Sequence, residues 1–206
     1  MGDLRRASEI RQVELTDAAL HIIATKGIAA LSTRSLAEQV GLSSGAIFRH
    51  FATLDALLEA VVGRVEAVLE ATYPPATLPP LARLERFMEV RSAAVGQQLG
   101  ILRLVLSEQF LLALPKSGSE RLAACVERTR AFVARCLREG QRVGEVRADL
   151  SVEALAPIVM GTVQMLALST ASAKRRAIEA ESVRDALLVL LRSPDAPTSQ
   201  SRKSSK

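Results

Sequence analysis

The sequence predicts an all-α protein of about nine helices, with a small three-helix N-terminal domain and a larger helical domain behind it. Aromatic residues make up only 3% of the 206 residues. The core must therefore consist of Leu, Val, Ile and Ala, and this composition favours helices over strands. Apolar residues recur at helical spacing along the chain, and no segment alternates apolar and polar residues as a strand would.

The N-terminal elements follow from spacing and capping. Leu15, Ala19, Ile22 and Ile23 repeat at helical intervals, and Lys26-Gly27 ends this first helix. A second helix is expected over Thr33–Val40, a turn at Gly41-Leu42-Ser43, and a third helix over Ser44–His50. Thr53 is placed to cap a fourth helix that runs to Leu69, with Asp55 in its first turn.

Four prolines in Tyr73–Pro80 stop the fourth helix and predict a domain joint. The later helices are expected at Leu81–Gln98, with Pro79 and Pro80 at its start, and then at Ile101–Leu114, Ser119–Gly140, an uncharged segment capped by Ser151, and a last helix containing Val183–Leu191. Pro157 should kink or delay the uncharged helix. The domains are thus 1–53 and 54–193, with 54–73 as a linking helix, and a flexible tail follows at 194–206.

Composition restricts the cellular setting. The net charge of +5 permits an anionic partner without requiring one. Charged residues are spread through Met1–Leu15 and leave no apolar signal core, so no secretion signal is predicted. Cys125 and Cys136 are eleven residues apart in one helical pattern, which separates them by roughly 16 Å and prevents a disulfide between them. Two free core thiols fit a reducing cytoplasm.

The segment Ala154–Ala173 has no charged residue and is about as long as a membrane span. It also contains Pro157, Gly161 and several hydroxyl and amide side chains, which a span would disfavour. We therefore expect a helix buried in a core or a subunit interface, and no membrane association.

Thr33–His50 has the features of a helix-turn-helix. Gly41 tolerates a left-handed turn, and Ala37 is small enough for a close helix crossing. The third helix begins with the small side chains that entry into a DNA major groove requires, at Ser43, Ser44, Gly45 and Ala46. From spacing alone, an ordinary helical hairpin in an all-α core remains an alternative.

The segment Gly27–Leu57 resembles the N-terminal domain of TetR-type (tetracycline-repressor-like) transcriptional regulators. The matching positions cover about 30 residues and are Gly27, Thr33, Leu36-Ala37, Gly41-Leu42-Ser43, Phe48-Arg49-His50-Phe51 and Leu57. One helix precedes this segment and some six follow, which is also similar to the family.

The resemblance implies that Ser44, Gly45, Ala46, Arg49 and His50 face DNA and that Thr33 meets a phosphate. The full set of expected DNA contacts is Thr33, Arg34, Ser43, Ser44, Gly45, Ala46, Phe48, Arg49 and His50. Two positions depart from the family pattern. Phe48 stands where a tyrosine is usual, and Leu54 where a lysine is usual, so a hydroxyl and a cation that would meet phosphate are missing.

The expected DNA-binding domain is weakly charged. Residues 1–51 hold six arginines and lysines against five acids, a net charge of +1. Binding would depend on an N-terminal arm with Arg5, Arg6 and Arg11, on Arg34 and Arg49, on backbone N–H groups at helix starts, and on doubling through a dimer.

For the larger domain, the resemblance implies effector sensing and dimerisation. Polar or adaptable residues inside apolar helices are the candidates for effector contact: Met88, Arg91, Arg103, Glu108, Gln109, Thr129, Gln164 and Met165. Each charged one could instead lie on a solvated face. The scarcity of aromatic residues argues against a flat cationic dye and favours a flexible aliphatic or amphipathic effector.

The resemblance implies a ligand-responsive DNA-binding regulator, a repressor that a small molecule releases from a palindromic operator, and the cysteine usage fits a cytoplasmic setting. A homodimer is expected through a four-helix bundle of Ala154–Ala173 and the helix of Val183, Ala186, Leu187, Leu190 and Leu191. The alternative is an effector-independent nucleoid or division factor. His21 and His50 lack metal-ligand spacing, and no zinc, redox or phosphate-loop motif occurs, so no metal, cofactor or enzymatic activity is expected.

Overall fold

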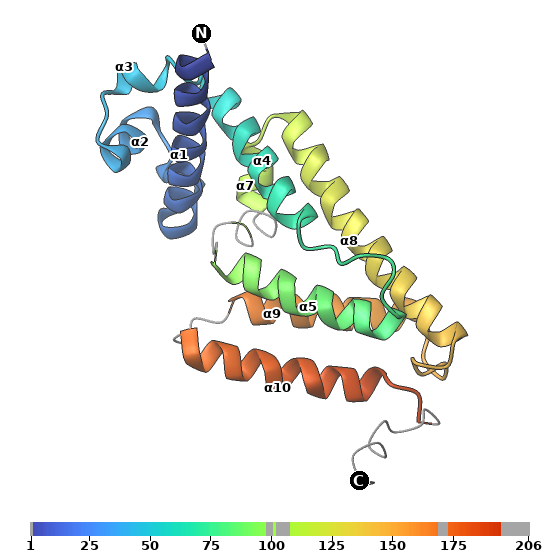
Figure 1. Ribbon diagram of the computed structural model, residues 1–206. Helices are drawn as coiled ribbons and strands as arrows, with labels where there is room; N and C mark the ends of the chain where they lie inside the picture. Colours follow the sequence, from blue (N-terminus) through green and yellow to red (C-terminus); the bar gives the residue numbers. More distant parts are fainter. Residues whose placement is uncertain (1, 98–100, 102–107, 169–172, 195–206) are drawn as a thin grey trace. The chain divides into compact units, whose positions relative to one another are not determined.

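The computed structural model describes residues 2–97, 101, 108–168 and 173–194. In these ranges it contains nine α-helices and one 3-10 helix (Figure 1). Their bounds are α1 Gly2–Lys26, η1 Ile28–Ala30, α2 Thr33–Val40, α3 Ser44–Ile47, α4 Leu54–Glu70, α5 Pro80–Gln97, α7 Glu108–Ala113, α8 Lys116–Arg142, α9 Val152–Leu168 and α10 Ala173–Leu191. The described residues form no strand beyond an isolated bridge between Val146 and Arg192. The all-α prediction is confirmed.

The chain packs as two compact units. Unit 1 comprises Met1–Thr72 and Ala93–Glu127, and unit 2 comprises Tyr73–Ser92 and Arg128–Lys206. The helix α8 therefore contributes its first part to unit 1 and its second part to unit 2. These units are defined by packing, and the division of function at residues 53 and 54 stays a prediction. Apart from Pro194, the expected tail at 194–206 lies outside the described residues.

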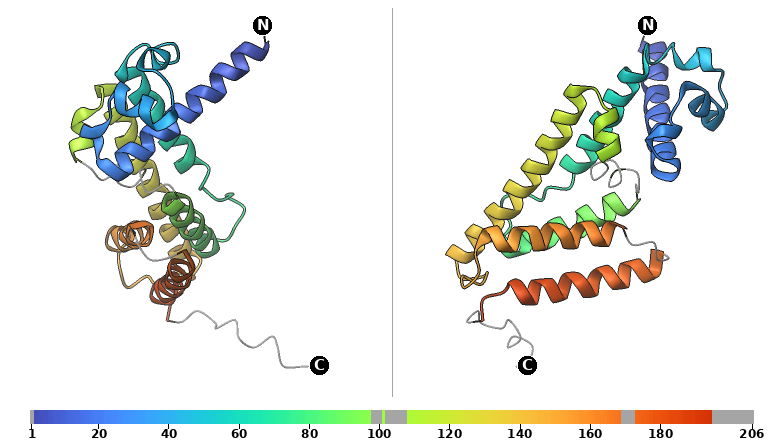
Figure 2. Two further views of the ribbon diagram at one scale, coloured as in Figure 1. Left: turned by 90° about the vertical axis from the view of Figure 1, so that its left-hand side faces the viewer. Right: turned by 180° about the vertical axis from the view of Figure 1, so that it is seen from behind.

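In unit 1 the helix α1 packs against α2, η1 and α4 (Figures 1 and 2). The apolar repeat of α1 supplies buried Leu15, Ala19, Ile22 and Ile23, as its spacing predicts. Thr53 caps α4 by accepting a hydrogen bond from the Ala56 N–H at 3.0 Å. The N-terminal arm is not a separate segment, because α1 already begins at Gly2.

The first part of α8 is joined to α4 by an ion network in unit 1. Arg121 donates from Nη1 to Glu59 at 2.8 Å and from Nε to Glu66 at 3.1 Å, and its Nη2 also contacts Glu66. Ser117 donates to Glu59. The hydrogen bond to Glu66 is the main cause of a raised Arg121 pKa. The two helices approach closely beside this network, since a Cβ at Gly118 would lie 3.3 Å from Val62.

Unit 2 has its core between α5, α8, α9 and α10. Its buried side chains include Leu84, Phe87, Phe132, Val133, Leu137, Val159, Leu187, Leu188 and Leu191. The helices α9 and α10 pack against each other, as the views in Figures 1 and 2 show. Leu187 and Leu191 were expected at a subunit interface, and this expectation is wrong for both side chains. They are 5% and 1% exposed within a single chain, because they cover the core formed by α5 and α8.

Several helix boundaries differ from the sequence prediction. The helix α8 begins at Lys116 rather than Ser119, and α9 begins at Val152, before Pro157. Pro157 does not delay α9, since the Ser151 hydroxyl accepts from the Ala154 N–H at 3.2 Å and starts the helix upstream. Of the expected Ile101–Leu114 helix, the described part contains α7. Across the described residues, no helix is long and apolar enough to cross a membrane.

Cys125 and Cys136 are both buried free thiols on α8. Their shared helix agrees with the prediction that they do not bond to each other. Burial raises the pKa of the Cys136 thiol to about 11. Cys136 is therefore protonated at neutral pH and acts as a core residue.

The loop after α8 fastens two other helices of unit 2. Glu145 accepts from the Leu81 N–H at the start of α5 at 3.0 Å, and the Arg147 N–H donates to Leu191 at the end of α10 at 2.8 Å. The loop folds back over Gly140, where an added Cβ would lie 2.5 Å from Val146 Cγ2. Val146 is 1% exposed, so it has little room to move.

We expect Gly140→Ala to destabilise the protein, although alanine is favoured over glycine in a helix by about 1 kcal/mol. The overlap with Val146 should outweigh that gain and cost about 1–3 kcal/mol net. Val146→Ala removes Cγ2, so Gly140→Ala should cost much less in that background. Chemical unfolding of the four proteins measures this coupling. Equal effects of Gly140→Ala in both backgrounds would contradict the contact.

Candidate nucleic-acid interface

The turn between α2 and α3 has the predicted geometry. Gly41 adopts φ 68° and ψ 34°, in the left-handed region, and the Leu42 N–H donates back to Ala37 at 2.9 Å. Ser32 and Ser35 cap α2 reciprocally, through side chain to backbone bonds of 3.1 and 3.0 Å. The start of α2 and the angle at its end are thus both fixed by local chemistry.

The third helix is shorter than expected. It was predicted to continue to His50, but α3 covers Ser44–Ile47 and Phe48–His50 form a turn. The backbone tightens here, because the Arg49 and His50 N–H groups donate three residues back, to Ala46 and Ile47. Ser43 caps the short helix by accepting from the Ala46 N–H at 3.3 Å.

Buried Ile47 anchors α3, and its opposite face is open. Ser43, Ser44 and Gly45 are exposed, and Ala46 is half-buried. A Cβ added at Gly45 would meet no atom within 4 Å. Phe48 is 52% exposed, although it is one of the chain's few aromatic side chains. The tip of α3 therefore presents small side chains beside one exposed ring.

The cations near this tip differ in their availability. Arg34 is exposed on α2 but pairs with Glu38 at 3.2 Å, and Arg11 pairs with Glu14 at 2.7 Å. Arg6 is exposed on α1, and the Arg5 side chain lies outside the described part. Arg49 is exposed and forms no ion pair with any described residue. Arg49 is therefore the cation of the helix-turn-helix that is ready to meet an anion.

His50 is held by α1 rather than projecting freely. It is half-buried, its Nδ1 lies 3.4 Å from the Ser8 hydroxyl, and its carbonyl accepts from Gln12 at 3.0 Å. The sequence analysis did not identify Ser8 or Gln12 as part of this region. In the sequence, Ser8 and Gln12 are marked only by their place on the polar face of α1. The sequence does not indicate which turn this face contacts. Thr33, at the first position of α2, is half-buried.

Three of the eight effector candidates come together in unit 2. Tyr73 donates or accepts a hydrogen bond with Thr129 at 3.0 Å, and the Arg91 guanidinium lies 5.1 Å from the Tyr73 ring centre and 4.9 Å from that of Phe87. Met88 is buried in the same core. Tyr73 was considered only as part of the proline-rich break, so its role as the centre of this cluster was missed.

The other candidates do not join this cluster. Gln164 is half-buried on α9, and Met165 next to it is 69% exposed. Arg103 lies outside the described residues. Glu108 and Gln109 lie in α7, but their side chains are outside the described part.

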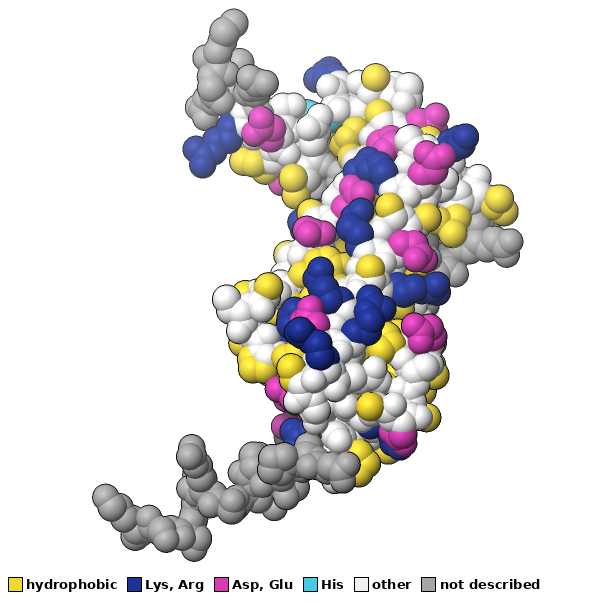
Figure 3. Space-filling view, turned by 90° about the vertical axis from the view of Figure 1, so that its right-hand side faces the viewer, with side chains coloured by type: hydrophobic (Ala, Val, Ile, Leu, Met, Phe, Trp, Pro, Cys, Tyr) yellow, Lys and Arg dark blue, Asp and Glu magenta, His cyan; other side chains and the backbone are white. Residues whose placement is uncertain are grey.

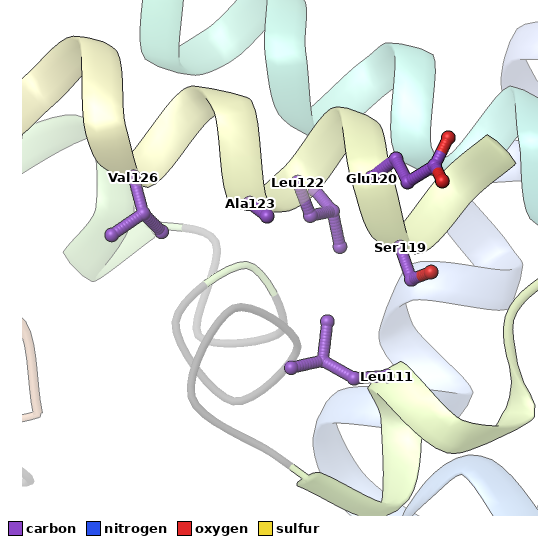
Figure 4. A pocket seen from close by; sticks show the side chains of 6 residues that line it. All are labelled: Leu111, Ser119, Glu120, Leu122, Ala123 and Val126. Atoms are coloured by element: carbon purple, nitrogen blue, oxygen red, sulfur yellow. The ribbon is translucent and has the colours of Figure 1, made fainter. Parts of the chain in front are cut away.

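A pocket of about 330 Å³ lies in unit 1, between α7 and the first part of α8 (Figure 4). Its lining is mostly apolar and consists of Leu111, Ser119, Glu120, Leu122, Ala123 and Val126. None of the predicted effector residues lines it. The described side chains contain no group of three or more His, Cys, Asp or Glu that could hold a metal ion.

Comparison with known sequences gives two family matches. Residues 15–61 match the model of bacterial regulatory proteins of the tetR family, and residues 113–187 match a tetracyclin repressor-like C-terminal domain. Together the two segments cover more than half of the chain. A curated relative, the HTH-type transcriptional regulator BetI of Paraburkholderia phytofirmans, is 39% identical over 57 residues. This alignment spans 28% of the chain and only 29% of BetI.

Solved structures agree over most of the chain. The ketosteroid transcriptional regulator KstR2 of Mycobacterium tuberculosis superimposes with a TM-score of 0.78 at 19% identity, over 89% of this chain and 95% of KstR2. AibR, solved with isovaleryl coenzyme A and operator DNA, superimposes with a TM-score of 0.70 at 14% identity, over 89% of this chain and 99% of AibR. At these identities the likeness establishes the fold. Because residues 15–61 and residues 113–187 both match models of one family, the chain belongs to the TetR family of bacterial regulatory proteins.

Proposed function

We propose that this protein is a ligand-responsive transcriptional repressor that binds a palindromic DNA operator as a homodimer in the cytoplasm. A small-molecule effector releases it from the operator. The proposal assigns it no catalytic activity and no cofactor. Family membership supports this function, and so does BetI, a named transcriptional regulator that matches over 57 residues.

The open tip of α3 is the observation that carries the proposal. Small side chains at Ser43, Ser44 and Gly45 allow the helix to approach base edges, and exposed Arg49 supplies a charge at the same end. Phe48 lacks a hydroxyl, so it would contact the sugar–phosphate backbone or a thymine methyl through apolar surface. Thr33, Arg34, Ala46 and His50 complete the proposed contact set.

For the effector, we propose an amphipathic or aliphatic molecule. AibR was crystallised with isovaleryl coenzyme A, whose acyl group is a short aliphatic chain. The two candidate effector sites in this chain are the apolar pocket beside α7 and the cluster of Tyr73, Met88, Arg91 and Thr129 in unit 2. An effector-independent nucleoid or division factor remains the alternative function.

A selection of genomic DNA fragments by the purified full-length protein tests the proposal. We expect enrichment of one palindromic sequence and loss of binding when a cognate acyl thioester or related small molecule is added. Enrichment of DNA without any common sequence would support the nucleoid alternative instead. Failure to bind DNA in the absence of effector would refute the regulator function.

The contact residues can be separated by their effect on specificity. Arg49→Ala should cost on the order of 1–3 kcal/mol and relax one position of each half-site if Arg49 reads a base edge. If Arg49 meets phosphate, binding to all DNA sequences should weaken equally.

Leu54 is 38% exposed at the start of α4, so Leu54→Lys should add a phosphate contact. It should steepen the salt dependence by roughly two units per dimer. Gel shifts across salt measure both effects, with Leu54→Gln as the uncharged control.

The dimer should form through exposed apolar positions of α9 and α10. Ile158 and Met165 are 52% and 69% exposed at heptad spacing on α9, and Val183 and Leu190 are 38% and 63% exposed at the same spacing on α10. We expect Met165→Glu and Leu190→Glu to give folded monomers that no longer bind the operator. Leu187→Glu, at a buried position, should instead unfold the chain. Sedimentation and circular dichroism distinguish these results, and a dimer that survives both exposed changes would refute the interface.

A further inference from the structure

The second part of α8 is strongly basic, and residues 173–206, with eight arginines and lysines against four acids, carry an equal net charge. Residues 128–142 contain five arginines and one glutamate, a net charge of +4 in a chain whose total is +5. Residues 1–51, which include the helix-turn-helix, carry +1. All five of these arginines are exposed: Arg128, Arg130, Arg135, Arg138 and Arg142. The face drawn in Figure 3 carries several arginine and lysine side chains, with acidic side chains among them.

Ion pairing distinguishes three of these arginines from most others. Many described arginines elsewhere pair with a neighbouring carboxylate, as in the exposed pairs Arg34–Glu38 and Arg86–Glu89 and the half-buried arginines of Arg64–Asp17 and Arg147–Asp149. Arg6, Arg49 and Arg192 are exposed and, like the three on α8, have no ion pair among the described residues. Within the described part of the chain, Arg135, Arg138 and Arg142 form no ion pair. The glutamate among them, Glu139, is taken by Arg83 of α5 at 2.6 Å.

These three residues, which we call the arginine stripe, lie on one face of α8. Arg138 follows Arg135 by three residues and precedes Arg142 by four, and this spacing places neighbouring side chains together on a helix surface. The stripe extends for about 10 Å along the axis. The Arg135 guanidinium rests 5.8 Å from the Phe132 ring centre, which helps to order one end.

The shape of the stripe decides between kinds of anionic partner. Small-molecule sites are concave, whereas the stripe lies on the exposed, convex side of a helix. A membrane surface would require large apolar side chains beside the cations. Between residues 128 and 143, the exposed apolar neighbours are one alanine, Ala131, and one larger side chain, Val143. An extended polyanion fits this surface better than either.

We propose that the arginine stripe binds the phosphates of double-stranded DNA without regard to sequence, as a contact surface separate from α3. Guanidinium groups donate two parallel hydrogen bonds to a phosphate, and duplex DNA carries about one charge per 1.7 Å of its axis. The choice of DNA as the polyanion rests on the proposed function, which brings the protein to DNA. The charge and exposure of the stripe are independent of it.

A pair of charge-matched variants tests this proposal in the full-length protein. Arg138→Gln with Arg142→Gln removes two cations of the stripe. Arg86→Gln with Lys116→Gln removes two exposed cations that are already paired, with Glu89 at 2.6 Å and Glu120 at 3.8 Å. Affinity for a random-sequence duplex is measured by fluorescence anisotropy across salt, and thermal unfolding confirms that each variant is folded.

The stripe variant should bind at least several-fold more weakly at low salt. Its slope of log affinity against log salt should be shallower by about 1.8 units per chain, since each lost phosphate contact contributes about 0.9. The paired control should stay close to the unaltered protein. Equal loss in the two variants would mean that only total charge matters and would overturn the proposal, as would no loss in either.

Two further measurements separate the possible partners and the two proposals. Loss of binding to vesicles of equimolar phosphatidylglycerol and phosphatidylcholine, or to polyglutamate, with unchanged DNA binding, would assign the stripe to another partner and overturn the proposal. Arg49→Ala should reduce binding to the selected operator while leaving the effect of the stripe variant on random DNA intact. If no operator is selected but the stripe variant still weakens random-DNA binding, the proposed function fails and the stripe proposal stands.

Discussion

The guanidinium of Arg121 fixes the arrangement on which unit 1 depends. It extends from α8 to two carboxylates of α4, Glu59 and Glu66, which are seven residues apart and therefore lie on the same face of that helix. On α1, Asp17 accepts from Arg64 of α4 at 3.0 Å. The helix α4 is thus fastened to α1 by one ion pair and to α8 by a fork of two. Because it bridges both, the helix-turn-helix packs as one unit with the first part of α8.

This arrangement gives α8 a particular position in the molecule. It is one continuous helix, Lys116–Arg142, yet it supplies Arg121 to unit 1 and the buried side chains Phe132, Val133 and Leu137 to unit 2. The polar interactions of its first part are directional and specific to α4. The contacts of its second part are mainly apolar, and the polar ones include the pair between Arg83 and Glu139 and the hydrogen bond between Tyr73 and Thr129. The two parts of α8 are therefore held by different forces, and changes in salt should act mainly on the first.

The distribution of charge explains how a nearly neutral helix-turn-helix can serve a DNA-binding protein. Arg11 and Arg34 are engaged with carboxylates, so Arg49 and the backbone at helix starts supply much of the local attraction. Specificity would then come from the close approach that the small side chains of α3 permit. The helix α8 adds a larger positive charge, because its exposed arginines outnumber its acids.

The sequence by itself determined the helical class, the order of the elements and the turn and caps of the helix-turn-helix, although not the length of α3. Periodicity, Gly41, Ser43 and Thr53 act within a few residues, so their consequences can be derived without knowing what packs against them. Contacts between distant segments were decided only by the tertiary structure. His50 meets Ser8 and Gln12, Tyr73 joins Arg91 to Thr129, and Leu187 faces a core rather than a partner. Each of these depends on which helix faces lie opposite one another, and the spacing of residues along a single helix does not contain that information.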